Sequence, residues 1–233
     1  MKLYVADISN LPEPLSCPEV LQKLPMERQQ KIYNSKQEKS RRQSMGVGLL
    51  LQKVLALYHM EDSQVFAGDC GKPMIEGLEF SLSHSGDLVI CAVSDKPVGC
   101  DVEIVRKAPE RVAERYFSCG EQEYLSRFSG EEYDRAFFRL WTMKESYVKM
   151  TGEGMGLPFS EYELLVDACA SLGYESSARV LRDGEVQDCY ISEISLQGYI
   201  ISICAESSAH MEVIWENSLF ISTHHLDNVR WNV

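Results

Sequence analysis

The spacing of apolar residues changes along the chain, and this change restricts the fold to a mixture of helices and sheets. Over Ser44–Met60 the apolar side chains recur every three or four residues, which is typical of an amphipathic helix. Over Glu79–Ile104 they alternate with polar residues or form short runs between two turns. This pattern predicts three strands in an antiparallel meander.

The second half of the chain repeats this order of elements. Helical periodicity covers Ala108–Arg127. A further helix is predicted from Ser129, which has the spacing of a capping box with Glu132, to Gly152. Strands are expected at 162–166, 178–182, 189–194, 199–205 and 213–215. The sequence therefore predicts an α+β fold of two similar halves, residues 1–105 and 106–233, each a small antiparallel sheet packed with helices.

The acidic charge of the chain limits its partners. The 233 residues carry a formal charge of −12, whereas a nucleic-acid surface needs a basic stripe. The sequence shows neither a signal peptide nor an apolar run long enough to span a membrane, and its eight cysteines are scattered without a Cys-x-x-Cys pair. We therefore expect a cytoplasmic protein with reduced thiols that binds neither nucleic acid nor membrane.

Two carboxylates stand out in the last strand of the predicted meander. If Val98, Cys100 and Val102 face the core, Asp101 and Glu103 project together from the opposite face, with Cα atoms about 6.5–7 Å apart. Such a pair can converge on Mg²⁺, which accepts one or two carboxylates together with phosphate oxygens and water. An Asp-x-Glu sequence is also typical of an ordinary solvated strand, so the pair alone does not identify a metal site.

A second group of charged residues lies on the predicted helix 129–152. Trp141, Glu145 and Lys149 fall on nearly one line of this helix, and Lys144 flanks it. A buried tryptophan beside a solvent-exposed Glu145–Lys149 ion pair would explain the spacing equally well. The apolar stripe of the helix, however, places Lys144 and Glu145 at the edge of its buried face.

Taken together, the two segments resemble the hallmark motifs of the 4′-phosphopantetheinyl transferase superfamily. Residues 99–103 keep its Gly-x-Asp-x-Glu pattern, and residues 141–149 keep its Trp-x-x-Lys-Glu-x-x-x-Lys pattern. The length and flanking segments resemble the surfactin-synthetase-activating type, a monomer of two pseudo-symmetric halves with the active site in the cleft between them. The resemblance implies Mg²⁺ ligation by Asp101, Glu103 and Glu145.

The same resemblance implies a binding site for coenzyme A. In the helix motif, Lys149 matches the lysine near the pyrophosphate, and Lys144 would also meet the nucleotide. Upstream, segments at 25–31, 71–73 and 83–86 resemble family segments that contact the nucleotide, and Arg42 stands at the position of a family arginine, although the adjacent Arg41 is an alternative. The residues expected at the nucleotide are therefore Arg28, Lys31, Arg42, Lys72, Ser83 and His84.

The reaction implied by the resemblance moves phosphopantetheine from coenzyme A to a serine of an acyl or peptidyl carrier protein. Glu121 and Glu145 compete for the role of general base; a metal ligand loses basicity, which favours Glu121 as the base and leaves Glu145 as the ligand. Lys149 would offset charge on the leaving phosphate. A magnesium-dependent hydrolase and a carrier-binding module without turnover are the two competing interpretations.

Overall fold

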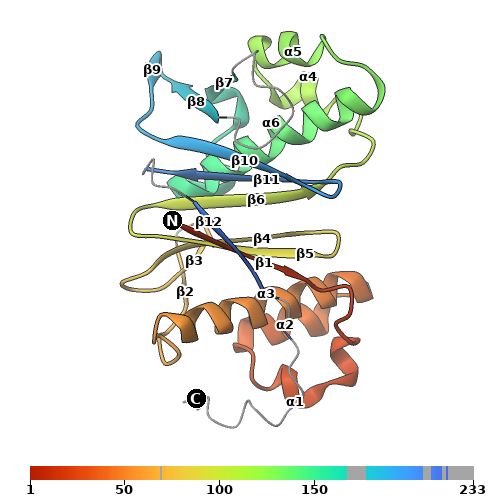
Figure 1. The fold of residues 1–233 in the computed structure, drawn as a ribbon, viewed down its shortest axis with the longest axis vertical. Helices are drawn as coiled ribbons and strands as arrows, with labels where there is room; N and C mark the ends of the chain where they lie inside the picture. Colours follow the sequence, from red (N-terminus) through yellow and green to blue (C-terminus); the bar gives the residue numbers. More distant parts are fainter. Residues whose placement is uncertain (69, 167–176, 207–210, 217–218, 220–233) are drawn as a thin grey trace.

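The computed structural model describes residues 1–68, 70–166, 177–206, 211–216 and 219, so Cys169 and the last part of the expected second half lie outside the described residues. Figure 1 shows four successive layers along the long axis: helices, a first sheet, a second sheet and helices again. No helix in this part of the chain combines the length and apolar character needed to cross a membrane. The predicted α+β class is confirmed.

The first sheet has the strand order β12-β1-β5-β4 and carries the helices of the N-terminal segment. Its core is formed by apolar side chains of α3, such as Leu50 and Val54, packed against side chains of the sheet, such as Tyr4 and Val89. The strands are β1 (Lys2–Asp7), β4 (Glu79–Ser85), β5 (Leu88–Ser94) and β12 (Glu212–Trp215). The helices are α1 (Pro18–Leu21), α2 (Met26–Asn34) and α3 (Glu38–Leu57), and a separate hairpin joins β2 (Phe66–Ala67) to β3 (Pro73–Met74).

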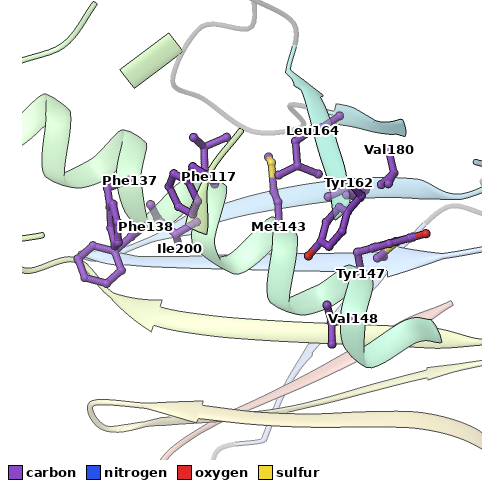
Figure 2. Close-up of a cluster of buried hydrophobic side chains, with 14 of the residues drawn as sticks. Phe117, Phe137, Phe138, Met143, Tyr147, Val148, Tyr162, Leu164, Val180 and Ile200 are labelled. Carbon is purple, nitrogen blue, oxygen red and sulfur yellow. The ribbon is translucent and has the colours of Figure 1, made fainter. Parts of the chain in front are cut away.

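The second sheet has the strand order β6-β11-β10-β8-β7, with β9 paired to β8. The long helix α6 (Gly130–Thr151) packs on it through an aromatic cluster that includes Phe137 and Tyr147 (Figure 2). Trp141 stacks on Phe137 and meets the edge of Phe159, so it anchors the helix in this cluster. The strands are β6 (Val98–Ile104), β7 (Tyr162–Val166), β8 (Ser177–Arg182), β9 (Glu185–Val186), β10 (Tyr190–Leu196) and β11 (Tyr199–Ala205).

The expected three-stranded meander is wrong in its last strand. β4 and β5 form the predicted hairpin, but β6 pairs with β11 of the second sheet, with Asp101 opposite Ser202. In return, β12 from the end of the chain pairs with β1 of the first sheet. The two sheets therefore exchange strands across residue 105, and β6 lies where they meet.

The helix boundaries differ from the prediction in two places. α3 runs from Glu38 to Leu57 instead of from Ser44 to Met60. The apolar pattern missed its first turns because these turns are polar. The region 108–127 contains two short helices, α4 (Val112–Tyr116) and α5 (Cys119–Leu125). α6 ends as predicted before Gly152, which has a positive φ of 74°, but Ser129 makes no side-chain cap. The capping box forms instead at the start of α5.

Gly99 allows α6 to lie directly on β6. A Cβ atom at this position would overlap the backbone of α6 at Ser146 and Met150, and backbone atoms cannot move aside as a flexible side chain can. A side chain there would force the helix away from the strand that carries Asp101 and Glu103. The glycine of the Gly-x-Asp-x-Glu pattern is thus explained by the close approach of helix and strand.

We expect Gly99→Ala to lower the free energy of unfolding by about 3 kcal/mol, at the upper end of the usual cost of overpacking. Urea denaturation followed by circular dichroism measures the change. Gly156→Ala is the matched control, since a Cβ at Gly156 would meet no described residue within 4 Å apart from its chain neighbours. Equal stability of the two variants would contradict the proposed contact.

Candidate active site

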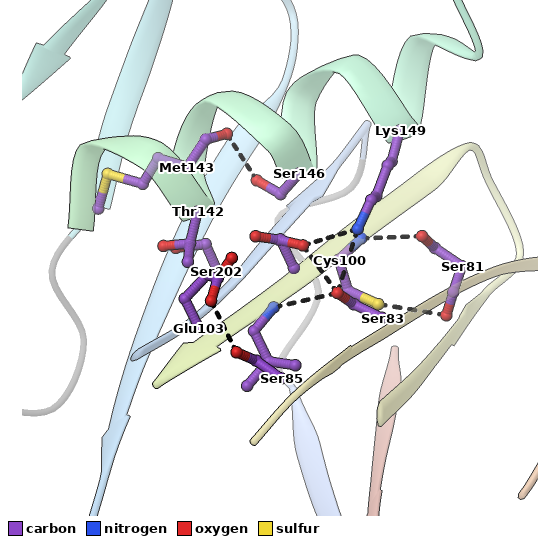
Figure 3. A network of polar contacts seen from close by, with 12 residues as sticks. Ser81, Ser83, Ser85, Cys100, Glu103, Thr142, Met143, Ser146, Lys149 and Ser202 are labelled. Atoms are coloured by element: carbon purple, nitrogen blue, oxygen red, sulfur yellow. Dashed lines mark hydrogen bonds and ion pairs between the residues drawn. The ribbon is translucent and has the colours of Figure 1, made fainter. Parts of the chain in front are cut away.

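Asp101 is the most constrained acid of the candidate site. The sequence left open a solvated strand face, but α6 covers this face and Asp101 is only 6% exposed. Its Oδ1 accepts hydrogen bonds from Lys149 Nζ and Ser83 Oγ, each at 2.7 Å. Figure 3 shows Lys149 reaching from α6 toward Ser83, to which it also donates. Its Oδ2 is buried and has no hydrogen-bond partner among the described residues. One lone carboxylate oxygen therefore remains available to a ligand.

Glu103 and Glu145 lie close to Asp101. Glu103 comes from the same strand, and its Oε2 accepts hydrogen bonds from Ser85 Oγ at 2.6 Å and from Arg106 Nη1 at 2.9 Å. Glu145 comes from α6 and is half-buried. Neither Ser85 nor Arg106 was predicted as a site residue; the alternation of Ser81, Ser83 and Ser85 along β4 is the sequence feature that points to the serine.

The charges of these groups act on one another. Burial raises the pKa of Glu145, and the negative charges of Asp101 and Glu103 raise it further. Burial also raises the pKa of Asp101, which Lys149 partly offsets. For Lys149, burial is the largest influence and opposes the charged form, but Asp101, Cys100 and Glu145 together outweigh it, so the pKa of Lys149 is raised. The three acids thus share a site in which additional positive charge is favourable.

In the described residues, no three His, Cys, Asp or Glu side chains are arranged so that they alone could hold a metal ion. The structure therefore brings the three expected ligands into one electrostatic cluster without closing a coordination shell. Lys149, with a side chain 29% exposed, supplies the nearest positive charge to Asp101. A divalent cation would have to share this cluster with the lysine.

Lys144 and Glu121 lie in the core of the C-terminal helices instead of in the site. Both side chains are 0% exposed, and Lys144 Nζ donates to Glu121 Oε1 at 2.6 Å and to the carbonyl oxygen of Tyr162 at 3.0 Å. Glu121 also accepts the backbone N–H groups of Ser118 and Leu164. This geometry disagrees with the expectation that Lys144 contacts a nucleotide and that Glu121 takes a proton from a substrate.

The basic residues expected at the nucleotide occupy several elements around the site. Arg28 and Lys31 lie on α2, half-buried and exposed respectively. His84 follows Ser83 on β4; loss of hydration lowers the pKa of His84, and the charges of Lys149 and Arg28 lower it further. His84 is therefore within electrostatic range of both an α2 cation and the acidic cluster.

The structure also distinguishes the two adjacent arginines of α3. Arg41 Nε donates to Glu13 at 2.6 Å and Arg41 Nη1 to the carbonyl oxygen of Ser35, so its guanidinium is already engaged. Arg42 pairs with Glu38 and lines a cavity of about 350 Å³, and its buried Nε has no partner in the part of the chain that the structure describes. The cavity supports the choice of Arg42 over Arg41.

Lys72 lies at the beginning of β6. Its Nζ donates to the carbonyl oxygen of Val98 at 3.0 Å, two residues before the strand reaches Cys100. Burial lowers the pKa of Lys72. The lysine therefore lies beside the strand that carries Asp101, although its present partner is the backbone.

Comparison with known proteins gives these residues a family context. The model of the 4′-phosphopantetheinyl transferase superfamily matches residues 97–204, a range that includes Asp101, Glu103, Glu145 and Lys149. The chain is 30% identical to the 4′-phosphopantetheinyl transferase psf-1 of Bacillus pumilus, over 75% of this chain and 76% of that protein. It is also 30% identical to the 4′-phosphopantetheinyl transferase Sfp of Bacillus subtilis (strain 168), over 72% and 75% of the two chains.

A third relative is also a 4′-phosphopantetheinyl transferase. The 4′-phosphopantetheinyl transferase HetI of Nostoc sp. is 37% identical over 51% of this chain and 54% of its own length. The matched regions and the geometry around Asp101 agree with one another, and the chain belongs to the 4′-phosphopantetheinyl transferase superfamily.

Proposed function

We propose that the protein transfers 4′-phosphopantetheine from coenzyme A to a serine hydroxyl of an apo acyl or peptidyl carrier protein and releases 3′,5′-ADP. Membership of the family supports this activity. The observation that carries the proposal is the ion pair between buried Asp101 and half-buried Lys149, which lies next to Glu103 and Glu145 inside the segment that the family model matches. We further propose that the enzyme acts as a cytoplasmic monomer, with its active site between the two sheets.

Mg²⁺ fits the acidic cluster. The unpaired buried Oδ2 of Asp101 is a hard oxygen ligand, and Glu103 and Glu145 supply two more carboxylates within electrostatic range. These oxygen donors suit Mg²⁺ better than softer metals, which prefer nitrogen or sulfur. When bound, the ion would polarise the pyrophosphate oxygens of coenzyme A as a Lewis acid. Asp101, Glu103 and Glu145 would hold it.

The residues of the chain perform the remaining steps by position and charge. As a general base takes the proton of the serine hydroxyl, the serine oxygen attacks the β-phosphorus of coenzyme A, and the bond from that phosphorus to the bridging oxygen of 3′,5′-ADP breaks. Lys149 offsets the negative charge that grows on the departing phosphate. Arg28, Lys31, Arg42 and His84 bind the 3′-phosphate end of the donor, with Ser83 and Lys72 near the nucleotide. The two candidate general bases are Glu121 and Glu145. Glu121 is buried and Glu145 is half-buried, so of these two only Glu145 has access to solvent.

A single assay separates this function from its two rivals. The full chain is incubated with coenzyme A, Mg²⁺ and an apo carrier protein, and the carrier is weighed by mass spectrometry. A phosphopantetheine mass added to the carrier supports the transferase. Release of pantetheine phosphate without a change in the carrier would instead identify a hydrolase, and binding of the carrier without any product would identify a module that has lost turnover.

The metal assignment predicts the behaviour of Glu145→Gln. Removing one negative charge from the cluster should raise the Mg²⁺ concentration for half-maximal transfer by about tenfold, which corresponds to roughly 1.4 kcal/mol of binding free energy. Transfer rates are measured over a Mg²⁺ titration. Glu132→Gln is the control, because Glu132 lies exposed on the same helix. An unchanged requirement in Glu145→Gln would remove it from the ligand set.

The buried Lys144–Glu121 pair leads to a prediction about stability. Glu121→Gln leaves Lys144 charged in a dry core and should lower the free energy of unfolding by about 3 kcal/mol. Thermal denaturation measures the loss. If the variant keeps wild-type stability and loses only the transfer rate at saturating Mg²⁺, Glu121 is a catalytic base after all.

The basic residues predict how the enzyme distinguishes its donor. Dephospho-coenzyme A lacks the 3′-phosphate and should bind at least about tenfold more weakly, since one charge-assisted hydrogen bond contributes about 1.5–3 kcal/mol. Calorimetry with both nucleotides measures the ratio. Arg42→Ala should reduce this discrimination, whereas Arg41→Ala should keep it because Arg41 is held by Glu13. Equal loss in both variants would refute the choice of Arg42.

A further inference from the structure

The two sheets meet along a line of serine side chains, which we call the serine seam: Ser81, Ser83 and Ser85 of β4. Each serine hydroxyl oxygen accepts a backbone N–H of β6. Cys100 N donates to Ser81 Oγ at 3.0 Å, and Val102 N donates to Ser83 Oγ at 3.3 Å. The third bond runs from Ile104 N to Ser85 Oγ at 3.1 Å. In an ordinary sheet, backbone carbonyl groups would accept these N–H groups. Here the serine hydroxyl groups of β4 accept them and so join the edge strands β4 and β6.

Two of the three hydroxyl groups also donate a hydrogen bond to a carboxylate. Ser83 Oγ donates to Asp101 Oδ1, and Ser85 Oγ donates to Glu103 Oε2 at 2.6 Å. Ser81 lies opposite Cys100, whose thiol donates to the carbonyl oxygen of Ser81. Ser81 therefore bonds to a thiol-bearing residue, whereas Ser83 and Ser85 bond to carboxylates. Figure 3 shows Ser85 and Glu103 facing each other across the seam.

The backbone bond fixes where the hydroxyl proton of Ser85 can point. The hydroxyl uses a lone pair for the N–H of Ile104 and has one proton to donate, which Glu103 accepts. Ser85 is 8% exposed, so water does not compete freely for this proton. The other partner of Glu103, Arg106, has a side chain 54% exposed and would hold the carboxylate less firmly.

We propose that Ser85 is a positioning residue that holds Glu103 in the orientation needed to bind the divalent cation, a role that rests on the proposed function. Groups that hydrogen-bond to metal-binding carboxylates orient them and tune metal affinity. Because the same hydroxyl joins β4 to β6, the orientation of Glu103 is coupled to the contact between the two sheets.

Metal affinity, measured without turnover, tests the proposal. The full chain is mixed with coenzyme A and titrated with Mn²⁺, and free Mn²⁺ is followed by electron paramagnetic resonance. Ser85→Ala should raise the dissociation constant for Mn²⁺ by about tenfold. Ser85→Thr keeps the hydroxyl and should restore affinity. Ser81→Ala, which removes an equivalent seam bond opposite a thiol, should change the constant by less than about twofold, because it leaves both carboxylates held.

A second readout comes from transfer rates. Ser85→Ala should increase the Mg²⁺ concentration for half-maximal transfer by about the same factor as the Mn²⁺ constant, with kcat near the wild-type value at saturating Mg²⁺. If Ser85→Ala fails to fold, Ser85→Cys replaces it, since a thiol is a weak donor of similar shape.

The possible outcomes separate this proposal from the proposed function. An effect of Ser85→Ala no larger than that of Ser81→Ala overturns the role of Ser85, even if the wild-type protein transfers phosphopantetheine. A wild-type protein that binds Mn²⁺ but transfers nothing overturns the proposed function, and the Mn²⁺ affinities of the variants still decide the role of Ser85.

Discussion

The close contact between α6 and β6 brings Glu145 and Lys149 of the helix to Asp101 of the strand. Without a side chain at Gly99, the backbone of the helix lies on the strand, and Lys149 reaches Asp101 at 2.7 Å. Glu145, one turn earlier on the helix, then lies within electrostatic range of the same carboxylate. A helix held farther from β6 would lose the Lys149–Asp101 ion pair and the proximity of Glu145 to Asp101. Both the packing of α6 and the arrangement of these charges therefore depend on Gly99.

The contact between α6 and β6 lies at the junction of the two sheets. β6 belongs to the second sheet through β11, while its outer edge is bound by the serine seam of the first sheet. Asp101 and Glu103 are thus held by elements from both sides. A site at such a junction is sensitive to the arrangement of the two sheets, whereas a site within either sheet would not be.

The sequence predicted the elements of the site better than their partners. Strand period and motif spacing placed Asp101, Glu103 and Glu145 correctly on β6 and α6, because these features depend on local geometry. The pairing of β6 with β11 was missed, since it joins residues about a hundred positions apart and turn chemistry favoured the nearer β5. The burial of Glu121 was missed for a similar reason, because it depends on Lys144 and Leu164.

The two lysines of the helix motif show why spacing alone was insufficient. Lys144 and Lys149 are five residues apart, so on an α-helix they project about 140° from each other. One therefore points into the aromatic core and pairs with Glu121, while the other points to β6 and pairs with Asp101. Each lysine neutralises an acid from another element, at different burial and with different consequences. The motif thus places two lysines with different roles on one helix: Lys144 pairs with an acid in the core, and Lys149 pairs with an acid in the site. The two roles can be distinguished only from the elements that surround the helix.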